Sequence, residues 1–216
     1  MRAMSDAAYR PLAGILWMIA TGFCFVMVTA LVKLLGGRIP AAESAFLRYL
    51  LGLLFFIPAW KQLASMKLGA RGWTLFSVRG VFHTLGVICW FYAMTRIPIA
   101  EVTAMNYLNP VYVSLLAVFF LGEQIAARRI IAIVAALLGA LVILRPGVRE
   151  LDPGHIAMIF TALLFAGSYL TAKILSGEHS AIVVVAMLSI TVTVGLAPFA
   201  AANWVTPALG ELGILF

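Results

Sequence analysis

Charged side chains are scarce in this 216-residue chain. They make up 11% of the residues, whereas hydrophobic side chains make up 64% and the mean hydropathy is +1.08. Soluble domains carry about 25% charged and about 45–50% apolar residues. A water-soluble fold is excluded because it cannot hide this much apolar surface from water. The sequence therefore predicts an integral membrane protein that is surrounded by the lipid bilayer.

Side chains with catalytic or metal-binding chemistry are also few. The three histidines, His83, His155 and His179, lie on different predicted helices and loops, and none has a carboxylate at the spacing of a metal-binding motif. No GxSxG-type nucleophile sequence occurs. A membrane-embedded enzyme is therefore disfavoured, and we expect no catalytic residues, no metal and no other cofactor. Cys24 and Cys89 both fall inside apolar segments, and we interpret them as small apolar residues.

Acidic residues are outnumbered by basic ones, with 8 Asp and Glu against 15 Lys and Arg and a net charge of +7. The basic residues stand singly in short connections between apolar segments and form no patch that follows a phosphate backbone. Nucleic-acid binding is therefore not expected. If the N-terminus is cytoplasmic, more basic residues fall in the inner connections than in the outer ones, as the positive-inside rule requires.

Long apolar segments dominate the chain, and a helix that crosses a bilayer needs about 20 such residues. We predict helices over 12–32, 41–60, 74–95, 98–121, 129–145, 154–175 and 180–202. Pro40, Pro98 and Pro153 stand at or just before helix starts, where the missing N–H costs nothing. The expected fold class is an all-α, polytopic transmembrane helix bundle.

The second half of the chain begins to repeat the first half. With the numbering shifted by 140, identical residues coincide without a gap, among them Lys33 with Lys173, Pro58 with Pro198, Gly14 with Gly154 and Gly37 with Gly177. We expect one five-helix unit over 1–147 and an incomplete second unit over 148–216, which about 70–80 further residues would complete at membrane-helix lengths. Because five is odd, the second unit is inverted, an arrangement typical of secondary transporters.

Three stretches of the first unit carry a recurring pattern: Phe46 to Gly52 (FLRYLLG), Ile97 to Glu123 with Asn109–Pro110 inside it, and Gly139 to Gly147 (GALVILRPG). In order and spacing they resemble the EamA type of the drug/metabolite transporter superfamily. The resemblance covers the first unit well and the sixth and seventh helices loosely, so the chain is similar to such a transporter truncated after about seven helices. It implies ten helices in two inverted units around a central cavity, and proton-coupled transport of a small metabolite or drug.

Polar residues inside the predicted helices are the candidate site, because a charge at the bilayer centre costs about 2.5–3.5 kcal/mol. Arg48 lies near the midplane of the second helix, where it either attracts an anionic group of the substrate or pairs with a neighbouring carboxylate. Arg79, His83 and Trp90 share one face of the third helix, which we expect to line the cavity. His83 either carries protons or bonds to a neighbouring helix.

The fourth helix is rich in amides. Asn106 and Asn109 share a face, and Pro110 removes the hydrogen bond to the carbonyl of Asn106 and predicts a kink. The two amides serve either the substrate site or helix–helix hydrogen bonds. Glu43 and Glu101 lie near the outer ends of their helices, where they either pair with arginines, Arg38 or Arg96, or protonate as coupling carboxylates.

These features favour a secondary transporter in the inner (cytoplasmic) membrane, with its N-terminus in the cytoplasm, that moves a small metabolite or drug by alternating access. The alternative is a non-transporting assembly subunit of the membrane or an inactive, truncated gene product. Ala132, Ala136 and Ala140 form a ridge of small residues on the fifth helix, which permits a homodimer contact.

Overall fold

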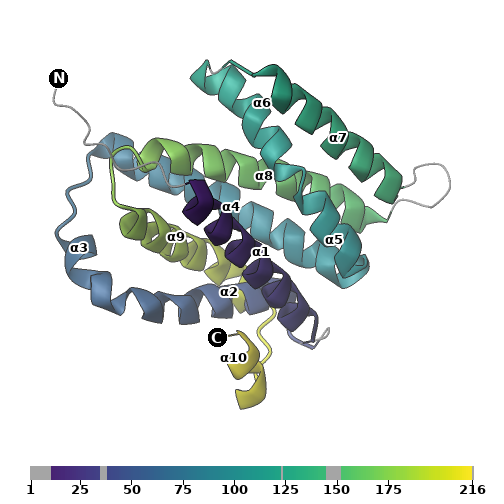
Figure 1. The fold of residues 1–216 in the computed structure, drawn as a ribbon. Helices are drawn as coiled ribbons and strands as arrows, with labels where there is room; N and C mark the ends of the chain where they lie inside the picture. Colours follow the sequence, from purple (N-terminus) through teal and green to yellow (C-terminus); the bar gives the residue numbers. More distant parts are fainter. Residues whose placement is uncertain (1–10, 35–37, 123, 145–151, 216) are drawn as a thin grey trace.

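A computed structural model describes residues 11–34, 38–122, 124–144 and 152–215, and these residues fold into helices joined by short connections (Figure 1). No strand occurs among them, so the all-α prediction is confirmed. The helices are α1 (Pro11–Leu34), α2 (Ala41–Gly52), the 3₁₀ helix η1 (Leu53–Ala59), α3 (Trp60–Ala64), α4 (Ala70–Arg96), α5 (Ile99–Asn106), α6 (Asn109–Leu121), α7 (Ala127–Leu144), α8 (Pro153–Leu175), α9 (Ala181–Ala202) and α10 (Leu209–Leu215).

Six helical spans in the described part of the chain are long and apolar enough to cross a membrane. They are Leu12–Leu34, Ala41–Ala64, Ala70–Arg96, Ile99–Leu121, Pro153–Leu175 and Ala181–Ala202. Residues 129–144 of the predicted span 129–145 lie in α7, an 18-residue helix that is not among these six, and residue 145 lies outside the described residues. The protein is therefore a multi-pass membrane protein.

Two of the spans are not continuous α-helices. The second changes at Leu53 to a 3₁₀ helix that contains Pro58, which cannot donate a backbone hydrogen bond. The fourth is interrupted between α5 and α6, where the N–H groups of Tyr107 and Leu108 donate to carbonyls three residues back at 3.1 and 3.0 Å. Pro110 follows directly, in the first turn of α6. The helix is thus interrupted just before Pro110, the residue at which the sequence predicts a kink.

The core of the bundle is the contact between α4 and α8, which lie side by side along most of their length (Figure 1). Their spans are each 50% buried, whereas the span of α1 is 6% buried. On one side of this pair, α9 packs against α2 and α4; on the other, α6 packs against α8. The α4–α8 seam therefore joins helices of the first predicted unit to helices of the second.

Close approach of α4 and α8 depends on a glycine. A Cβ atom at Gly86 of α4 would lie 2.6 Å from Cδ1 of Phe165 on α8, closer than real Cβ contacts come. Between α4 and α9, a Cβ at Gly80 would lie 2.6 Å from Cβ of Thr191. Small residues of this kind let membrane helices pack without intervening side chains.

The alanine ridge of α7 contributes to packing inside the chain. Ala140 is buried and lies in one apolar cluster with Leu108 and Ala162. Ala132, at the other end of the ridge, is exposed. At least the Ala140 end is therefore used within the chain itself.

Helix α10 is held near the start of α2 by a charge pair. Nε of Arg38 donates to Oε1 of Glu211 at 2.7 Å, and Nη2 of Arg38 donates to Oε2 of the same carboxylate. The backbone N–H of Ala208 also donates to Oε2 of Glu211, at 2.7 Å. The hydrogen bond from Arg38, followed by the one from Ala208, lowers the pKa of Glu211, and the same pairing raises the pKa of Arg38.

Acidification is expected to loosen α10. A carboxylate with a depressed folded-state pKa stabilises the fold fully above its unfolded pKa of about 4.3, and this contribution is lost as the pH falls through the lower folded value. We expect hydrogen exchange of residues 209–215, corrected for intrinsic rates, to accelerate below about pH 4 in the wild type. Glu211→Gln should show fast exchange at every pH; a variant that keeps the wild-type pH dependence would contradict this account.

Candidate functional site

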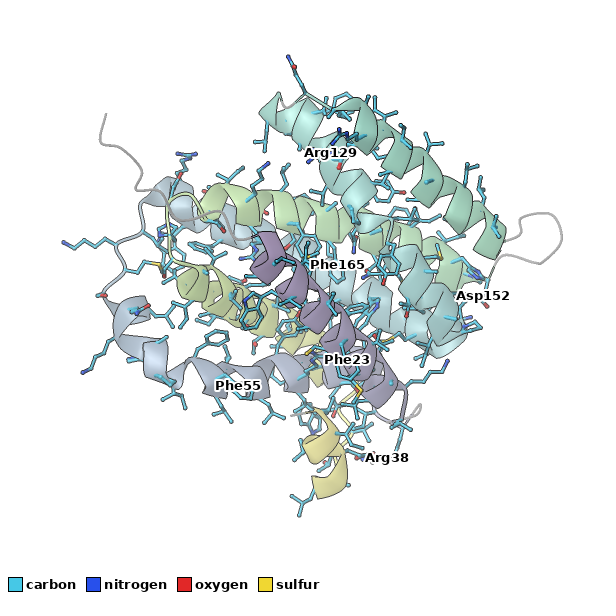
Figure 2. All side chains as sticks on the ribbon, viewed as in Figure 1. Phe23, Arg38, Phe55, Arg129, Asp152 and Phe165 are labelled. Atoms are coloured by element: carbon cyan, nitrogen blue, oxygen red, sulfur yellow. The ribbon has the colours of Figure 1, made fainter. Side chains whose placement is uncertain are left out.

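A cavity of about 280 Å³ opens on the α4–α8 seam and reaches α1 and α2. Four helices supply its walls. The lining residues are Thr21, Cys24, Phe25 and Val28 of α1, Arg48 and Tyr49 of α2, His83, Val87, Trp90 and Phe91 of α4, and Phe165 and Tyr169 of α8. Phe165 is labelled in Figure 2, where it lies beside α1. Because α8 belongs to the second predicted unit and the other three helices to the first, the cavity lies between the two units that the sequence predicts.

Aromatic rings form much of the cavity wall. Trp90 contacts Phe25 at 5.5 Å and Phe91 at 5.3 Å between ring centroids. Phe165 and Tyr169, one turn apart on α8, lie 6.2 Å apart. These are ordinary distances for offset and edge-to-face aromatic pairs. The wall is therefore an apolar surface suited to a planar ligand.

His83 sits in a chain of polar side chains from three helices. Its Nε2 lies 2.8 Å from the hydroxyl of Tyr49, and its Nδ1 lies 3.1 Å from the hydroxyl of Ser168. The imidazole also stacks on Phe165 at 4.7 Å. The helix-bonding role expected for His83 is therefore present, and both hydroxyls can donate or accept a proton in this chain of contacts.

Arg48 and Trp90 bring unpaired donors to the same cavity. The guanidinium of Arg48 is half-buried and has no acidic side chain or hydrogen-bond acceptor in range among the described residues. Trp90 is 5% exposed, and its indole Nε1 has no hydrogen-bond partner in the described structure. Buried polar groups are usually hydrogen-bonded. The buried indole N–H of Trp90 is therefore without an acceptor in the described part of the chain, and the half-buried guanidinium of Arg48 borders the same cavity.

Arg79 does not line this cavity, contrary to expectation. It is buried, and its Nη1 donates to the backbone carbonyl of Val184 on α9 at 2.6 Å. The reason is that the polar face of α4 meets different helices along its length. At Arg79 this face contacts α9, whereas at His83 it contacts α2 and α8. Arg79 joins two helices rather than facing the cavity.

Asn106 and Asn109 are also separate from the cavity. Nδ2 of Asn109 donates to Oδ1 of Asn106 at 2.8 Å across the break between α5 and α6. These helices pack on α8 and lie away from α2 and α9 (Figure 1). Of the six predicted residues, Arg48, His83 and Trp90 line this cavity, whereas Arg79, Asn106 and Asn109 do not. Their role in binding a substrate stays a prediction.

Glu101 pairs with a residue that sequence reasoning missed. Its Oε2 lies 2.8 Å from Nε2 of His155, and both side chains are buried. Nδ1 of His155 lies 3.0 Å from the backbone N of Asp152, whose carboxylate accepts from the N–H of Gly154 at 2.7 Å. His155 thus completes a capping box at the start of α8 while it binds the start of α5. The sequence signal was the Asp-Pro-x-His cap itself.

Glu43 is fully buried and takes a backbone partner. Its Oε2 accepts from the N–H of Val205 at 2.9 Å, and its Oε1 has no hydrogen-bond partner among the described residues. Arg38, the expected partner, bonds to Glu211 instead. The salt-bridge interpretation therefore needs correction for Glu43: this carboxylate ties α2 to the segment between α9 and α10.

Comparison with known proteins agrees with this architecture. Residues 12–145 match the EamA-like transporter family. The chain is 30% identical over 205 residues to the pseudopaline exporter CntI of Pseudomonas aeruginosa, covering 94% of this chain and 72% of that protein. It is 26% identical over 213 residues to an S-adenosylmethionine uptake transporter of Rickettsia prowazekii, covering 99% and 72%, respectively.

A third relative is a riboflavin transporter of Rhizobium johnstonii, 29% identical over 170 residues that cover 78% of this chain and 56% of that protein. Helices, cavity and relatives together define a membrane transporter of a small molecule. The chain belongs to the EamA-like transporter family. The resemblance noted in the sequence is confirmed.

Proposed function

We propose that the seam cavity is the substrate site of a secondary transporter that works by alternating access across the cytoplasmic membrane, with the N-terminus inside. The observation that carries the proposal is a cavity between the two predicted units that is lined by the guanidinium of Arg48 and by Trp90, whose buried indole N–H has no hydrogen-bond partner among the described residues. In transporters built from inverted repeats, substrate sites lie near the midplane at the repeat interface. When the two units move relative to each other, a ligand in a cavity at this place becomes accessible from one side of the membrane or from the other.

The division into units 1–147 and 148–216 is part of the proposal. A shift of 140 residues carries the starts of α1, α2 and α4 to within two residues of the starts of α8, α9 and α10. In this correspondence, α10 matches the first turns of α4, and α9 matches α2. The contacts agree with it, because α4 packs on α9 and α10 packs on α2. Reciprocal contacts of this kind are expected of two units related by a pseudo-two-fold axis.

We further propose that the chain is not an enzyme and leaves the covalent bonds of its substrate unchanged. Among the described residues no group of three His, Cys, Asp or Glu side chains is placed to hold a metal ion. The titratable groups of the lining are Cys24, Arg48, Tyr49, His83 and Tyr169, and no hydrogen bond joins the Cys24 thiol to a base that could activate it among the described residues. Binding and release, rather than bond cleavage, are what this lining supports.

Transport by the purified chain in proteoliposomes tests the proposal. The relatives named above are an exporter of pseudopaline and transporters of S-adenosylmethionine and riboflavin, so these compounds and a labelled metabolite extract are the first probes. We expect time-dependent accumulation of at least one compound in vesicles with the chain and none in empty vesicles. If nothing accumulates although the chain is folded and inserted in both orientations, the alternative of a non-transporting membrane subunit is favoured.

A further inference from the structure

We infer that the seam cavity selects a small organic anion that carries an aromatic ring, with the anionic group on Arg48 and the ring against Trp90 and Phe165. This inference rests on the proposed role of the cavity as the substrate site. It names a class of ligand from three properties of the described residues: the sign of the charge in the cavity, the kind of hydrogen-bonding groups that are unpaired, and the shape of the walls.

The charge in the cavity has one sign. Arg48 is the charged residue of the lining, and no Asp or Glu is among the lining residues. Four acidic side chains that the structure describes elsewhere in the bundle are already bonded: Glu43 to Val205, Glu101 to His155, Asp152 to Gly154 and Glu211 to Arg38. A guanidinium in apolar surroundings attracts an anion strongly because little water screens it. A cationic ligand would meet the same guanidinium with no compensating carboxylate.

The unpaired groups of the cavity are donors. A guanidinium presents several N–H groups and accepts nothing, and an indole nitrogen is a donor only. Arg48 and Trp90 therefore both call for acceptor atoms, such as the two oxygens of a carboxylate or an additional carbonyl of the ligand. Among the remaining polar groups of the lining, the hydroxyl of Thr21 already donates to the carbonyl of Trp17 at 2.8 Å, and Tyr49 and His83 bond to each other at 2.8 Å. The hydroxyl of Tyr169 can donate or accept.

The walls and the volume limit the rest of the ligand. Phe25, Trp90, Phe91, Phe165 and Tyr169 surround the space with ring faces and edges. A planar ring stacks on such walls better than a puckered aliphatic ring of similar size. The volume of about 280 Å³ is near the lower end of small-molecule pockets, which run from about 300 to 1,000 Å³. The ligand is therefore a small one.

Four matched compounds test the class directly on the purified chain. They are 3-phenylpropanoate (anion), 3-phenylpropan-1-ol (neutral), 3-phenylpropylamine (cation) and 3-cyclohexylpropanoate (anion without an aromatic ring). Binding is measured by equilibrium dialysis of tritiated 3-phenylpropanoate, with the other three as competitors. We expect 3-phenylpropanoate to bind at least tenfold more tightly than the alcohol, the cyclohexyl acid to bind several-fold more weakly, and the amine not to compete.

Variants assign the binding to the cavity. Arg48→Gln should weaken 3-phenylpropanoate at least tenfold, and Arg48→Lys should restore part of that loss because it keeps the charge but not the guanidinium geometry. Arg71→Gln is the matched control, because Arg71 is an exposed arginine that is not part of the cavity lining. Its Nη1 lies 3.2 Å from Oε1 of Glu178. Folding of each variant is checked by size-exclusion chromatography before binding is measured.

Each outcome decides the question. Preference for the amine, or equal binding of the acid and the alcohol, would overturn the anion assignment, as would an Arg71 variant that loses binding as much as the Arg48 variant. Equal binding of 3-phenylpropanoate and 3-cyclohexylpropanoate would overturn the preference for an aromatic ring and leave the preference for an anion in place. If one of these results is found while vesicles with the chain still accumulate a metabolite, the class of ligand is wrong and the transport function stands.

Discussion

Replacing Arg48 with glutamine is expected to lower the transport rate at least tenfold while the amount of folded protein in the membrane stays unchanged. A hydrogen bond to a charged group contributes about 1.5–3 kcal/mol, which corresponds to about 10- to 150-fold in binding. Folding should not suffer, because the guanidinium of Arg48 has no partner among the described residues to leave unsatisfied. Initial uptake into proteoliposomes, normalised to inserted protein, measures the effect.

Arg71→Gln serves again as the control and should transport at the wild-type rate. Its guanidinium forms an exposed ion pair, and such pairs contribute about 0–1 kcal/mol to stability. Arg48→Lys should fall between Arg48→Gln and the wild type. If Arg48→Gln transports at the wild-type rate, Arg48 is not part of the substrate site. Loss of the protein from the membrane would instead show that Arg48 serves folding.

Adding one methyl group at Gly86 is expected to destabilise the bundle. A Cβ there would lie 2.6 Å from the ring of Phe165, which is stacked on His83 and cannot simply swing away. Gly86→Ala should therefore lower the unfolding free energy by about 1–3 kcal/mol, the usual cost of overpacking. It should also shift the Phe165 ring at the cavity and weaken ligand binding.

The control for this change is Gly22→Ala on α1, where no heavy atom lies within 4 Å of the added Cβ. Alanine is favoured over glycine in a helix by about 0.5–1 kcal/mol, so this variant should be as stable as the wild type or slightly more stable. Thermal unfolding of the purified proteins in detergent compares the two. Equal midpoints for Gly86→Ala and Gly22→Ala would contradict the close α4–α8 contact.

The helices were predictable because the signal for them is local. Apolar runs of sufficient length define the spans, and Pro110 alone is enough to predict the break before α6. The 3₁₀ segment from Leu53 to Ala59 was not predicted, although Pro58 was recognised as part of the repeat. A proline signals a lost hydrogen bond, but the response of the helix, a kink or a tighter winding, depends on its neighbours.

The membership of the site was only partly predictable. Spacing shows which residues share a helical face, and it correctly grouped Arg79, His83 and Trp90 on one face of α4. It does not show which helix that face meets at each turn. In the structure this face contacts α9 at Arg79, whereas at His83 it contacts α2 and α8. One face of α4 therefore both binds a neighbouring helix and lines the cavity.

Partners far apart in sequence were the least predictable. Glu101 and His155 are 54 residues apart, and Arg38 and Glu211 are 173 apart. Nothing in the spacing of either pair indicates contact, whereas an adjacent arginine such as Arg96 is an obvious local partner for Glu101. Long-range pairs of this kind follow from the packing of helices that are distant in the sequence and become visible only when those helices are placed.

The most direct test of the central claim uses the chain's own thiols. Cys24 lines the seam cavity, whereas Cys89 on α4 is half-buried and does not line it. In the wild-type chain, a transported compound at saturating concentration should slow alkylation of Cys24 by N-ethylmaleimide and leave that of Cys89 unchanged, as read by peptide mass spectrometry. Unchanged alkylation of Cys24 in the presence of a compound that the chain transports would show that the substrate binds elsewhere.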